Sequence, residues 1–481
     1  MKTVAMFLAL WVFAVAQSAN AGDVTANTPP AYKDDPAVVA KIQALGDRSA
    51  VMLGRYKVAP ADAAKSHHAL KRGPGPRNYG NKMPYAPDRR TAMYCGANHN
   101  VPHRLNDVWE FHLGSNTWHL ICRPGTDATR LRAWTNRAAK ARKAIAAGKD
   151  VEKNKAFLEK DFADYARKWW SKCTVADGYL QDKANGGPVQ PWHTWDGVTY
   201  DEKTKRLYWA VLDSDNFKQA KHRVHIRRTR TYARATGQDP DTLVAQLKPG
   251  TSMYMYDPAK KRWFKQLGEG PFPIMRAMGA TLHYLPDIDK TIWYACVGCT
   301  PGGYDEGMWS YDATTNRWTN LIPGRKLRGM VHTRKIAPGG ELQVAYSPKH
   351  RKLVAVREEK TFVYDVAKNT WARAADNPAY GWDSVSVLDY DSHADVFLFV
   401  GKAGGRWSKK PWTLSAYDLK TGRWEVVKIN GAPLAQDHPT KHWLGQQYVG
   451  YYDPGYNAFV LYVGRTNRTW AYRHKSAAGN G

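Results

Sequence analysis

The chain has 481 residues and a formal net charge of +28, from 71 Lys and Arg against 43 Asp and Glu. Hydrophobic residues make up 43% and aromatic residues 12%, which is enough for a packed core and favours β-sheet. The charge favours a polyanionic partner, and beyond the N-terminus no apolar run approaches the roughly 20 residues that a membrane-spanning helix needs.

Residues 1–21, MKTVAMFLALWVFAVAQSANA, have the form of a secretory signal peptide. Lys2 precedes an uncharged apolar run, and Ala19-Asn20-Ala21 has the small-x-small pattern of a cleavage site. A membrane anchor is the weaker alternative, because polar residues interrupt the run. We therefore expect an exported protein, periplasmic or extracellular, with no membrane span.

A hairpin unit recurs along the rest of the chain. The stretch NDVWEFHLGSNTWHLI, residues 106–121, returns in four further copies, and in each an aromatic residue precedes a tryptophan by seven positions. The pairs are Phe111/Trp118, Tyr256/Trp263, Tyr311/Trp318, Tyr364/Trp371 and Tyr417/Trp424. Alternating apolar residues around a turn of Asn, Lys or Gly are typical of two antiparallel strands.

A second, differently patterned hairpin precedes each of these units, which gives four strands per repeat. The tryptophans of the last four pairs are 55, 53 and 53 residues apart, a period typical of β-propeller blades. We expect an all-β fold, a six-bladed propeller over residues 77–474, with seven blades as the alternative. The last unit lacks its fourth strand, and residues 49–58 of the N-terminal segment 22–76 could supply it and remove an exposed sheet edge.

Two insertions interrupt the repeat. Residues 126–184 are rich in Ala, Lys, Arg and Glu, with apolar residues at helical intervals, and predict a helical insertion. Residues 214–250 carry a dense cluster of Lys and Arg, and we expect a long basic loop there.

The repeat resembles the kelch family of β-propellers. The resemblance is carried by the D-x-W/Y-x-Y-D strand, the trailing Trp and the glycine that ends a strand, and it covers about residues 77–474. It departs from the family where the kelch Gly-Gly doublet is reduced to the single glycines Gly96, Gly298, Gly401 and Gly464.

Five cysteines, Cys95, Cys122, Cys173, Cys296 and Cys299, cannot all pair within one chain. One or two disulfides are expected in an oxidising compartment, with connectivity open. Cys296 and Cys299 have the C-x-x-C spacing of zinc or redox sites, but no second C-x-x-C completes a tetrahedral zinc site, so a structural disulfide or buried thiols are expected there.

The site is expected on one face of the propeller. If the first strand of each blade lines the axis, the connections between blades and those between strands two and three emerge on the same face. Eight of the 16 histidines fall in these loops, whereas His350 and His393 fall on the other face. Arginines and aromatic residues are frequent in the same loops.

The predicted catalytic residues are His193, His332 and Tyr304. The predicted substrate-binding residues are His99, His103, Arg104, Arg223, Arg276, Arg328, Arg334, Trp382, Arg406 and His442. Guanidinium groups bind carboxylate and sulfate in a bidentate manner, and aromatic faces stack on sugars, so an acidic polysaccharide is the expected partner. Single-stranded nucleic acid would suit a similar groove, and the export signal argues against it.

His, Tyr and Arg without a clear carboxylate pair favour β-elimination on a uronate over hydrolysis. In site composition the chain resembles propeller polysaccharide lyases, and a secreted propeller that only binds acidic glycan or a protein is the first alternative. A galactose-oxidase-like copper enzyme is the second. No cofactor is required for the lyase chemistry, although His99-x-x-x-His103 could hold a structural metal. The sequence leaves the oligomeric state open.

Overall fold

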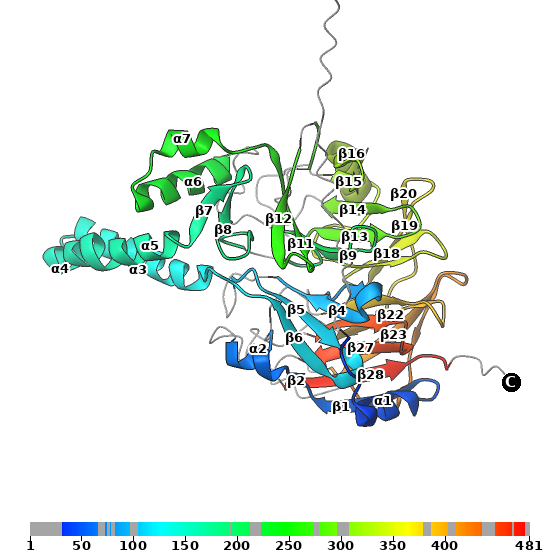
Figure 1. Cartoon of the computed structure of the whole chain (residues 1–481). Coiled ribbons are helices and arrows are strands. Elements are labelled where there is room, and N and C mark those ends of the chain that lie inside the picture. The colour runs from blue at the N-terminus through cyan, green and yellow to red at the C-terminus, as the bar shows by residue number, and fades with distance from the viewer. Residues whose placement is uncertain are drawn as a thin grey trace, which may run out of the picture. The chain divides into compact units, whose positions relative to one another are not determined.

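The computed structural model is mostly β, with 40% strand and 23% helix, and its strands form several four-stranded antiparallel sheets (Figure 1). It describes residues 31–65, 73–74, 77, 82–96, 104–191, 194–211, 223–268, 270–273, 275, 279–295, 307–378, 386–402, 410–434, 448–463 and 466–476. All the elements named below belong to the compact unit Tyr32–Gly481. The all-β fold class expected from the hairpin repeats is confirmed at this level.

Six sheets, here called sheets I to VI, contain the repeats. Sheet I contains β3 (Tyr85–Ala86), β4 (Thr91–Tyr94), β5 (Val108–His112) and β6 (Thr117–Cys122), with β2 (Lys57–Val58) parallel to β6. Sheet II contains β9 (Val198–Asp201), β10 (Arg206–Ala210), β11 (Gly250–Asp257) and β12 (Arg262–Leu267). Sheet III contains β13 (Thr281–Leu285), β14 (Lys290–Ala295), β15 (Gly307–Asp312) and β16 (Arg317–Ile322).

The remaining three sheets follow the same order. Sheet IV contains β17 (Gln343–Ser347), β18 (Lys352–Arg357), β19 (Lys360–Asp365) and β20 (Thr370–Arg373). Sheet V contains β21 (Val387–Asp391), β22 (Val396–Lys402), β23 (Trp412–Asp418) and β24 (Arg423–Val426). Sheet VI contains β26 (Tyr448–Asp453), β27 (Ala458–Val463) and β28 (Arg468–Arg473), then β1 (Ser49–Arg55) and β25 (Asn430–Gly431). In sheets I to V, hydrogen-bonded neighbours in the main four strands are also neighbours in sequence.

The register explains the seven-residue spacing of the sequence repeat. In sheet III, Tyr311 on β15 is the Cα partner of Trp318 on β16. Asn316 in the turn between them has a positive φ of 53°, a conformation that Asn tolerates better than most residues, and its side chain accepts a hydrogen bond from the Tyr311 hydroxyl at 2.9 Å. The side chain of Asp312 accepts from the backbone N–H of Thr314 at 2.8 Å, which fixes the start of the turn. Each aromatic-to-tryptophan unit therefore encodes one hairpin.

Sheet VI is completed by the N-terminal part of the chain. Strand β1 pairs antiparallel with β28, with Val51 opposite Ala471 and Met52 opposite Trp470. Strand β25 pairs in parallel with the other edge of β1. An early segment of the sequence thus takes the place of the fourth strand that the last repeat lacks.

Apolar cores fill the spaces between successive sheets. Each of these cores between sheets draws on two sheets. Met93 and Trp209 belong to the cluster of sheets I and II, and Met253 and Trp293 to that of sheets II and III. Further clusters join sheets III and IV, IV and V, V and VI, and VI and I. Alternation along each strand places apolar side chains on both faces, so that one sheet contributes to two cores.

Most helices lie in the sequence segments that connect one sheet to the next. They are α1 (Pro36–Gln43), α2 (Pro60–Lys65), α3 (Ala128–Ala146), α4 (Val151–Ala156), the π-helical η4 (Phe157–Phe162), α5 (Ala163–Trp170), α6 (Arg223–Thr236), α7 (Pro240–Ala245), α8 (Gly324–Arg328) and the π-helical η5 (Gly329–Thr333). Short 3₁₀ turns are η2 (Pro87–Arg89) and η3 (Leu113–Ser115). Among the described helices, none is long and apolar enough to cross a membrane.

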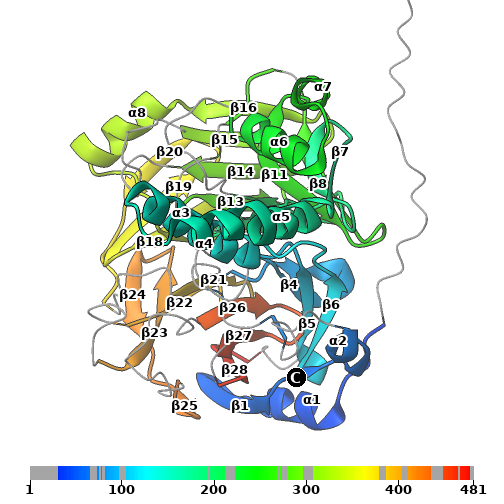
Figure 2. The same ribbon diagram turned by 90° about the vertical axis from the view of Figure 1, so that its left-hand side faces the viewer.

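Helices α3 to α5 correspond to the predicted insertion 126–184. Asp127 caps α3 by accepting hydrogen bonds from the N–H groups of Thr129 and Arg130 at 3.0 and 3.1 Å. The ring of Trp134 stacks on that of Tyr165, with centroids 4.6 Å apart, which joins α3 to α5. The insertion ends in the hairpin of β7 (Cys173–Ala176) and β8 (Tyr179–Asp182). Figures 1 and 2 place these helices together with α6 and α7 on one side of the sheets.

The expectation of a long basic loop over 214–250 is wrong for its described part, because α6 and α7 form there. Asp239 caps α7 by accepting from the N–H of Thr242 at 2.7 Å. Tyr232 and Leu243 are buried together with Trp170 of α5, so that the apolar residues within the basic sequence form a small core with the preceding insertion. Because Arg and His fill most of the remaining positions of α6, its sequence shows no clear helical periodicity of apolar residues.

Cys95, Cys122 and Cys173 are free and buried, which corrects the expectation of disulfides for these three. Burial raises the pKa of each of these thiols. They therefore pack as small apolar side chains. Cys296 and Cys299 lie outside the described residues.

Candidate functional site

Three predicted site residues lie together on a segment that we call the basic helix, residues 324–335. It comprises α8, η5 and the two residues that follow them, connects β16 to β17, and contains no acidic residue. Its exposed cationic and imidazole residues are Arg325, Lys326, Arg328, His332, Arg334 and Lys335. Leu327 and Met330 point the other way into the core between sheets III and IV, which fixes the orientation of the charged side. Arg328 and His332 are four residues apart and share one face.

The π-helical turn Gly329–Thr333 contains His332. Such turns are rare and are often found at functional sites. However, the basic helix packs on β15, towards the outer part of sheet III, and Figure 2 shows α8 at the periphery beside β16 and β20. Arg328, His332 and Arg334 thus lie near the outer part of sheet III, and their gathering with the other site residues over one central mouth stays a prediction.

Of the other predicted residues, only the side chain of Arg104 is described, and it is not at this surface. Arg104 is buried, with 6% of its surface exposed, and its backbone N–H donates to Thr129 Oγ1 at the start of α3 at 3.0 Å. Arg223 begins α6, and its side chain lies outside the described residues. Also outside them lie His99, His103, His193, Arg276, Tyr304, Trp382, Arg406 and His442.

A second candidate region, which the sequence reasoning missed, is a cavity of about 260 Å³ lined by the first strand of every sheet. We call it the central cavity. Each of these strands contributes one tyrosine at the same position of the repeat: Tyr85, Tyr200, Tyr284, Tyr346, Tyr390 and Tyr452. Two residues further along each strand, Pro87, Glu202, Pro286, Pro348, Ser392 and Pro454 line it at the turns to the second strand.

The hydroxyl groups of five of these tyrosines have acceptors in the turns. Tyr284 and Tyr390 donate to Asp289 and Asp395, each five residues further along, at 2.8 and 2.7 Å, and Tyr452 is within 2.9 Å of the corresponding Asn457. In sheets II and IV the fifth residue after the tyrosine is a cation, Lys205 and Arg351 respectively. There Tyr200 and Tyr346 donate instead to Asp88 and Asp287 in the turn of the preceding sheet, at 2.8 and 2.5 Å. Because these hydroxyls are occupied, the walls of the cavity are mainly aromatic.

Lys82, Asp196 and His283 form a buried cluster at one end of the central cavity. His283 Nε2 is 2.7 Å from Asp196 Oδ2, and Lys82 Nζ is 3.0 Å from His283 Nδ1 and 2.9 Å from the Leu282 carbonyl oxygen. Burial lowers the pKa of His283 to about 4, so the ring is neutral at pH 7. The neutral ring can donate Nε2–H to the Asp196 carboxylate, while Lys82 Nζ lies 3.0 Å from Nδ1 and 3.1 Å from Nε2.

Lys82 remains accessible from the cavity, with 18% of its side chain exposed, and forms an ion pair with Asp196 Oδ1 at 3.6 Å. Burial lowers the pKa of Lys82, and the charge of Asp196 acts in the opposite direction. An ammonium group has three N–H donors. Leu282 and His283 account for two of them within the described part of the chain.

Asp389 on β21 is the second charged group that lines the cavity near Lys82. Burial raises its pKa to about 6, although Oδ2 accepts from the N–H of Tyr452 at 2.7 Å and Oδ1 from the N–H of Tyr390 at 2.8 Å. Each carboxylate oxygen keeps a further lone pair. The cavity is thus lined by a donor, Lys82, and an acceptor, Asp389, whose charges interact.

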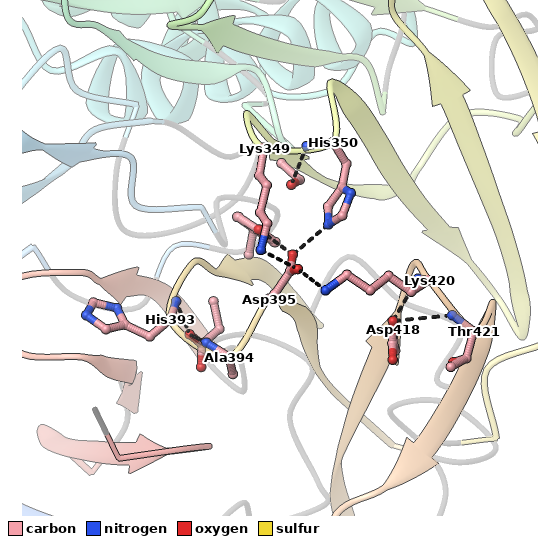
Figure 3. A network of polar contacts seen from close by, with 11 residues as sticks. Lys349, His350, His393, Ala394, Asp395, Asp418, Lys420 and Thr421 are labelled. Atoms are coloured by element: carbon pink, nitrogen blue, oxygen red, sulfur yellow. Dashed lines mark hydrogen bonds and ion pairs between the residues drawn. The ribbon is translucent and has the colours of Figure 1, made fainter. Parts of the chain in front are cut away.

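His350 and His393, which were assigned to the opposite face, lie in the turns between first and second strands (Figure 3). Asp395, in one of these turns, accepts hydrogen bonds from Tyr390 Oη, His350 Nε2, Lys349 Nζ and Lys420 Nζ at 2.7, 2.6, 2.7 and 2.9 Å. Burial opposes its ionisation, but these partners outweigh burial and lower the pKa of Asp395. This network joins sheets IV and V and is a structural clamp.

The signal that could have revealed the central cavity is the position before the repeat tyrosine. His283 and Asp389 both occupy it. Among the described residues, no group of three or more His, Cys, Asp or Glu is placed to hold a metal ion.

No protein-family model matches the chain, and no curated protein matches it significantly.

Proposed function

We propose that the chain is an exported, closed six-bladed β-propeller that acts on an acidic polysaccharide. Two observations support the closed arrangement: an apolar core joins each sheet to the next, including VI to I, and β1 pairs with β28. Full closure leaves no sheet edge open between the first and last repeats. Export is proposed from residues 1–21, and cleavage after Ala21 is tested by the mass of the mature protein.

The observation that carries the polysaccharide proposal is the acid-free exposed surface of the basic helix. Three arginines and two lysines lie on it around His332. Guanidinium groups match the planar geometry of carboxylate and sulfate, and the overall charge of +28 draws polyanions to the protein.

The concrete form of the proposal is a lyase that cleaves a uronate by β-elimination. Arg328 and Arg334 would neutralise the substrate carboxylate and so acidify the neighbouring C–H. The imidazole of His332 would remove that proton, the glycosidic C–O bond would break as the new C=C bond forms, and an acid would protonate the leaving oxygen. Tyr304 and His193 remain the proposed acid and its alternative.

The test is release of ultraviolet-absorbing unsaturated sugar from a panel of uronic polysaccharides. His332→Ala should abolish turnover while affinity for the polysaccharide is kept, and Arg328→Ala/Arg334→Ala should weaken binding. Arg317→Ala/Arg423→Ala, which removes two exposed arginines from β16 and β24, is the matched control. Binding without product from any member of the panel would leave the non-catalytic glycan-binding propeller and refute the lyase.

A further inference from the structure

We propose that the central cavity is a binding site for a single neutral sugar ring, separate from the basic helix. Two neighbouring hydroxyl groups of the ring would bridge the polar end, one accepting from Lys82 and the other donating to Asp389. This site does not depend on the acidic polysaccharide proposed above.

The volume sets the size of the ligand. A cavity of about 260 Å³ is just below the usual range of about 300–1,000 Å³ for small-ligand sites, so it suits one sugar ring rather than a larger enclosed ligand. The tyrosine and proline side chains of the wall offer flat apolar faces to the C–H faces of such a ring.

The charges at the polar end select a neutral ligand. Lys82 is the cation of the cluster, and the carboxylates of Asp196 and Asp389 lie close to it. An anionic ligand would meet these carboxylates, and a cationic ligand would meet the ammonium group. A hydroxyl pair can accept a hydrogen bond with one oxygen and donate one with the other, without carrying charge into a buried site.

The donor and the acceptor needed for this arrangement are present. Leu282 and His283 engage two of the three N–H groups of Lys82 within the described residues. Asp196 Oδ1, at 3.6 Å, forms an ion pair with Lys82 but is too distant for a hydrogen bond, so a ligand oxygen can accept from the third N–H. Backbone N–H groups of Tyr390 and Tyr452 fix the carboxylate of Asp389 in place, so that it is oriented before a ligand binds. Polar groups so fixed discriminate strongly against ligands that lack the matching hydroxyls.

The experiment is titration calorimetry of the full chain with D-glucose, D-galactose, D-mannose and D-glucuronate at two salt concentrations. At least one neutral hexose should bind saturably, with an affinity that salt leaves unchanged. Lys82→Met and Asp389→Asn should each weaken it by about tenfold or more, because each removes a charged hydrogen-bonding partner.

Ser392→Trp keeps the test decisive if the buried variants fail to fold. Ser392 is exposed in a turn that lines the cavity, so an indole there should block entry without disturbing the core. Thr314→Trp, in an exposed turn of sheet III, is the matched control and should bind normally. Absence of saturable binding by every neutral hexose, preference for glucuronate, or unchanged binding by Ser392→Trp would each overturn the proposal. Arg328→Ala/Arg334→Ala should leave hexose binding intact, so this site and the polysaccharide surface can fail independently.

Discussion

Tyr311 and Trp318, seven residues apart in the sequence, face each other directly across the β15–β16 hairpin, with ring centroids 4.9 Å apart. The corresponding pair Tyr256 and Trp263 in sheet II has centroids 5.3 Å apart. The two tryptophans differ in their hydrogen bonding. Trp263 Nε1 donates to the Asn106 carbonyl at 2.8 Å, whereas the buried Trp318 Nε1 has no acceptor in the described part of the chain.

This difference predicts unequal effects of the same substitution. Trp263 is 0% and Trp318 5% exposed, so Trp→Phe removes a similar apolar area at either site. Trp263→Phe also leaves the buried Asn106 carbonyl with only the weak S–H donor of Cys122, at 3.8 Å, and should cost about 1–3 kcal/mol more in the free energy of unfolding. Chemical denaturation of both variants measures the difference, and equal losses would contradict the role given to the Asn106 bond.

The clamp around Asp395 predicts a pH-dependent contribution to stability. Its pKa is lower in the folded than in the unfolded protein, so the stabilisation is present above the ordinary Asp pKa of about 3.9 and is lost as pH falls through the folded value. Asp395→Asn should therefore destabilise the protein at pH 7 by about 2 kcal/mol, and less as the pH approaches 3.

Asp312→Asn is the control for that measurement. Asp312 accepts from the Lys290 side chain at 2.6 Å, which lowers its pKa to about 2, but it has one side-chain partner where Asp395 has four. The loss at pH 7 should be smaller than for Asp395→Asn. A larger loss in the control would show that the multiple contacts of Asp395 contribute little.

The pairing of β1 with β28 predicts a specific cross-link. Val51 and Ala471 are Cα partners, so Val51→Cys/Ala471→Cys should form a disulfide that peptide mass mapping detects. Because the link closes a loop of nearly the whole chain, it should stabilise the fold by about 4 kcal/mol. Met52→Cys/Ala471→Cys should link poorly, since adjacent residues of a strand point to opposite faces. Efficient linking in that control would indicate a different register.

The basic helix predicts salt-dependent binding of polyanions. With heparin as the probe, affinity should fall as ionic strength rises, because exposed charges are screened. Loss of Arg328 and Arg334 together should weaken binding by roughly tenfold to a hundredfold at low salt and flatten the salt dependence. Surface plasmon resonance at two salt concentrations tests both, with Arg317→Ala/Arg423→Ala as the variant of equal charge. Affinity unchanged by salt would contradict an electrostatic surface.

The hairpins could be predicted from the sequence because their signal is local. The aromatic-to-tryptophan spacing reflects a direct cross-strand pair, and turn residues such as Asn316 mark the reversal of the chain. The observed registers confirm these hairpins and the four-stranded sheets that they build. Helix α6 was missed because arginine and histidine fill the positions around its few buried apolar residues.

The candidate site was harder to predict because its parts come from distant repeats. Lys82, Asp196, His283 and Asp389 belong to four different sheets or the segments leading into them, and none forms a local motif with another. Grouping histidines by loop gave weight to residues such as His332, which lies at the periphery of sheet III. Position within the repeat is the better guide, because equivalent positions of successive first strands line the same cavity.

The pairing of β1 with β28 also fixes when the fold can be finished. Ser49–Arg55 leaves the ribosome long before Arg468–Arg473, so its backbone must wait, without its native hydrogen-bonding partner, until those residues have been made. Sheets II to V can assemble from neighbouring segments, whereas sheet VI cannot. Sheet VI is therefore completed late, and the waiting strand is exposed to mispairing with another nascent copy.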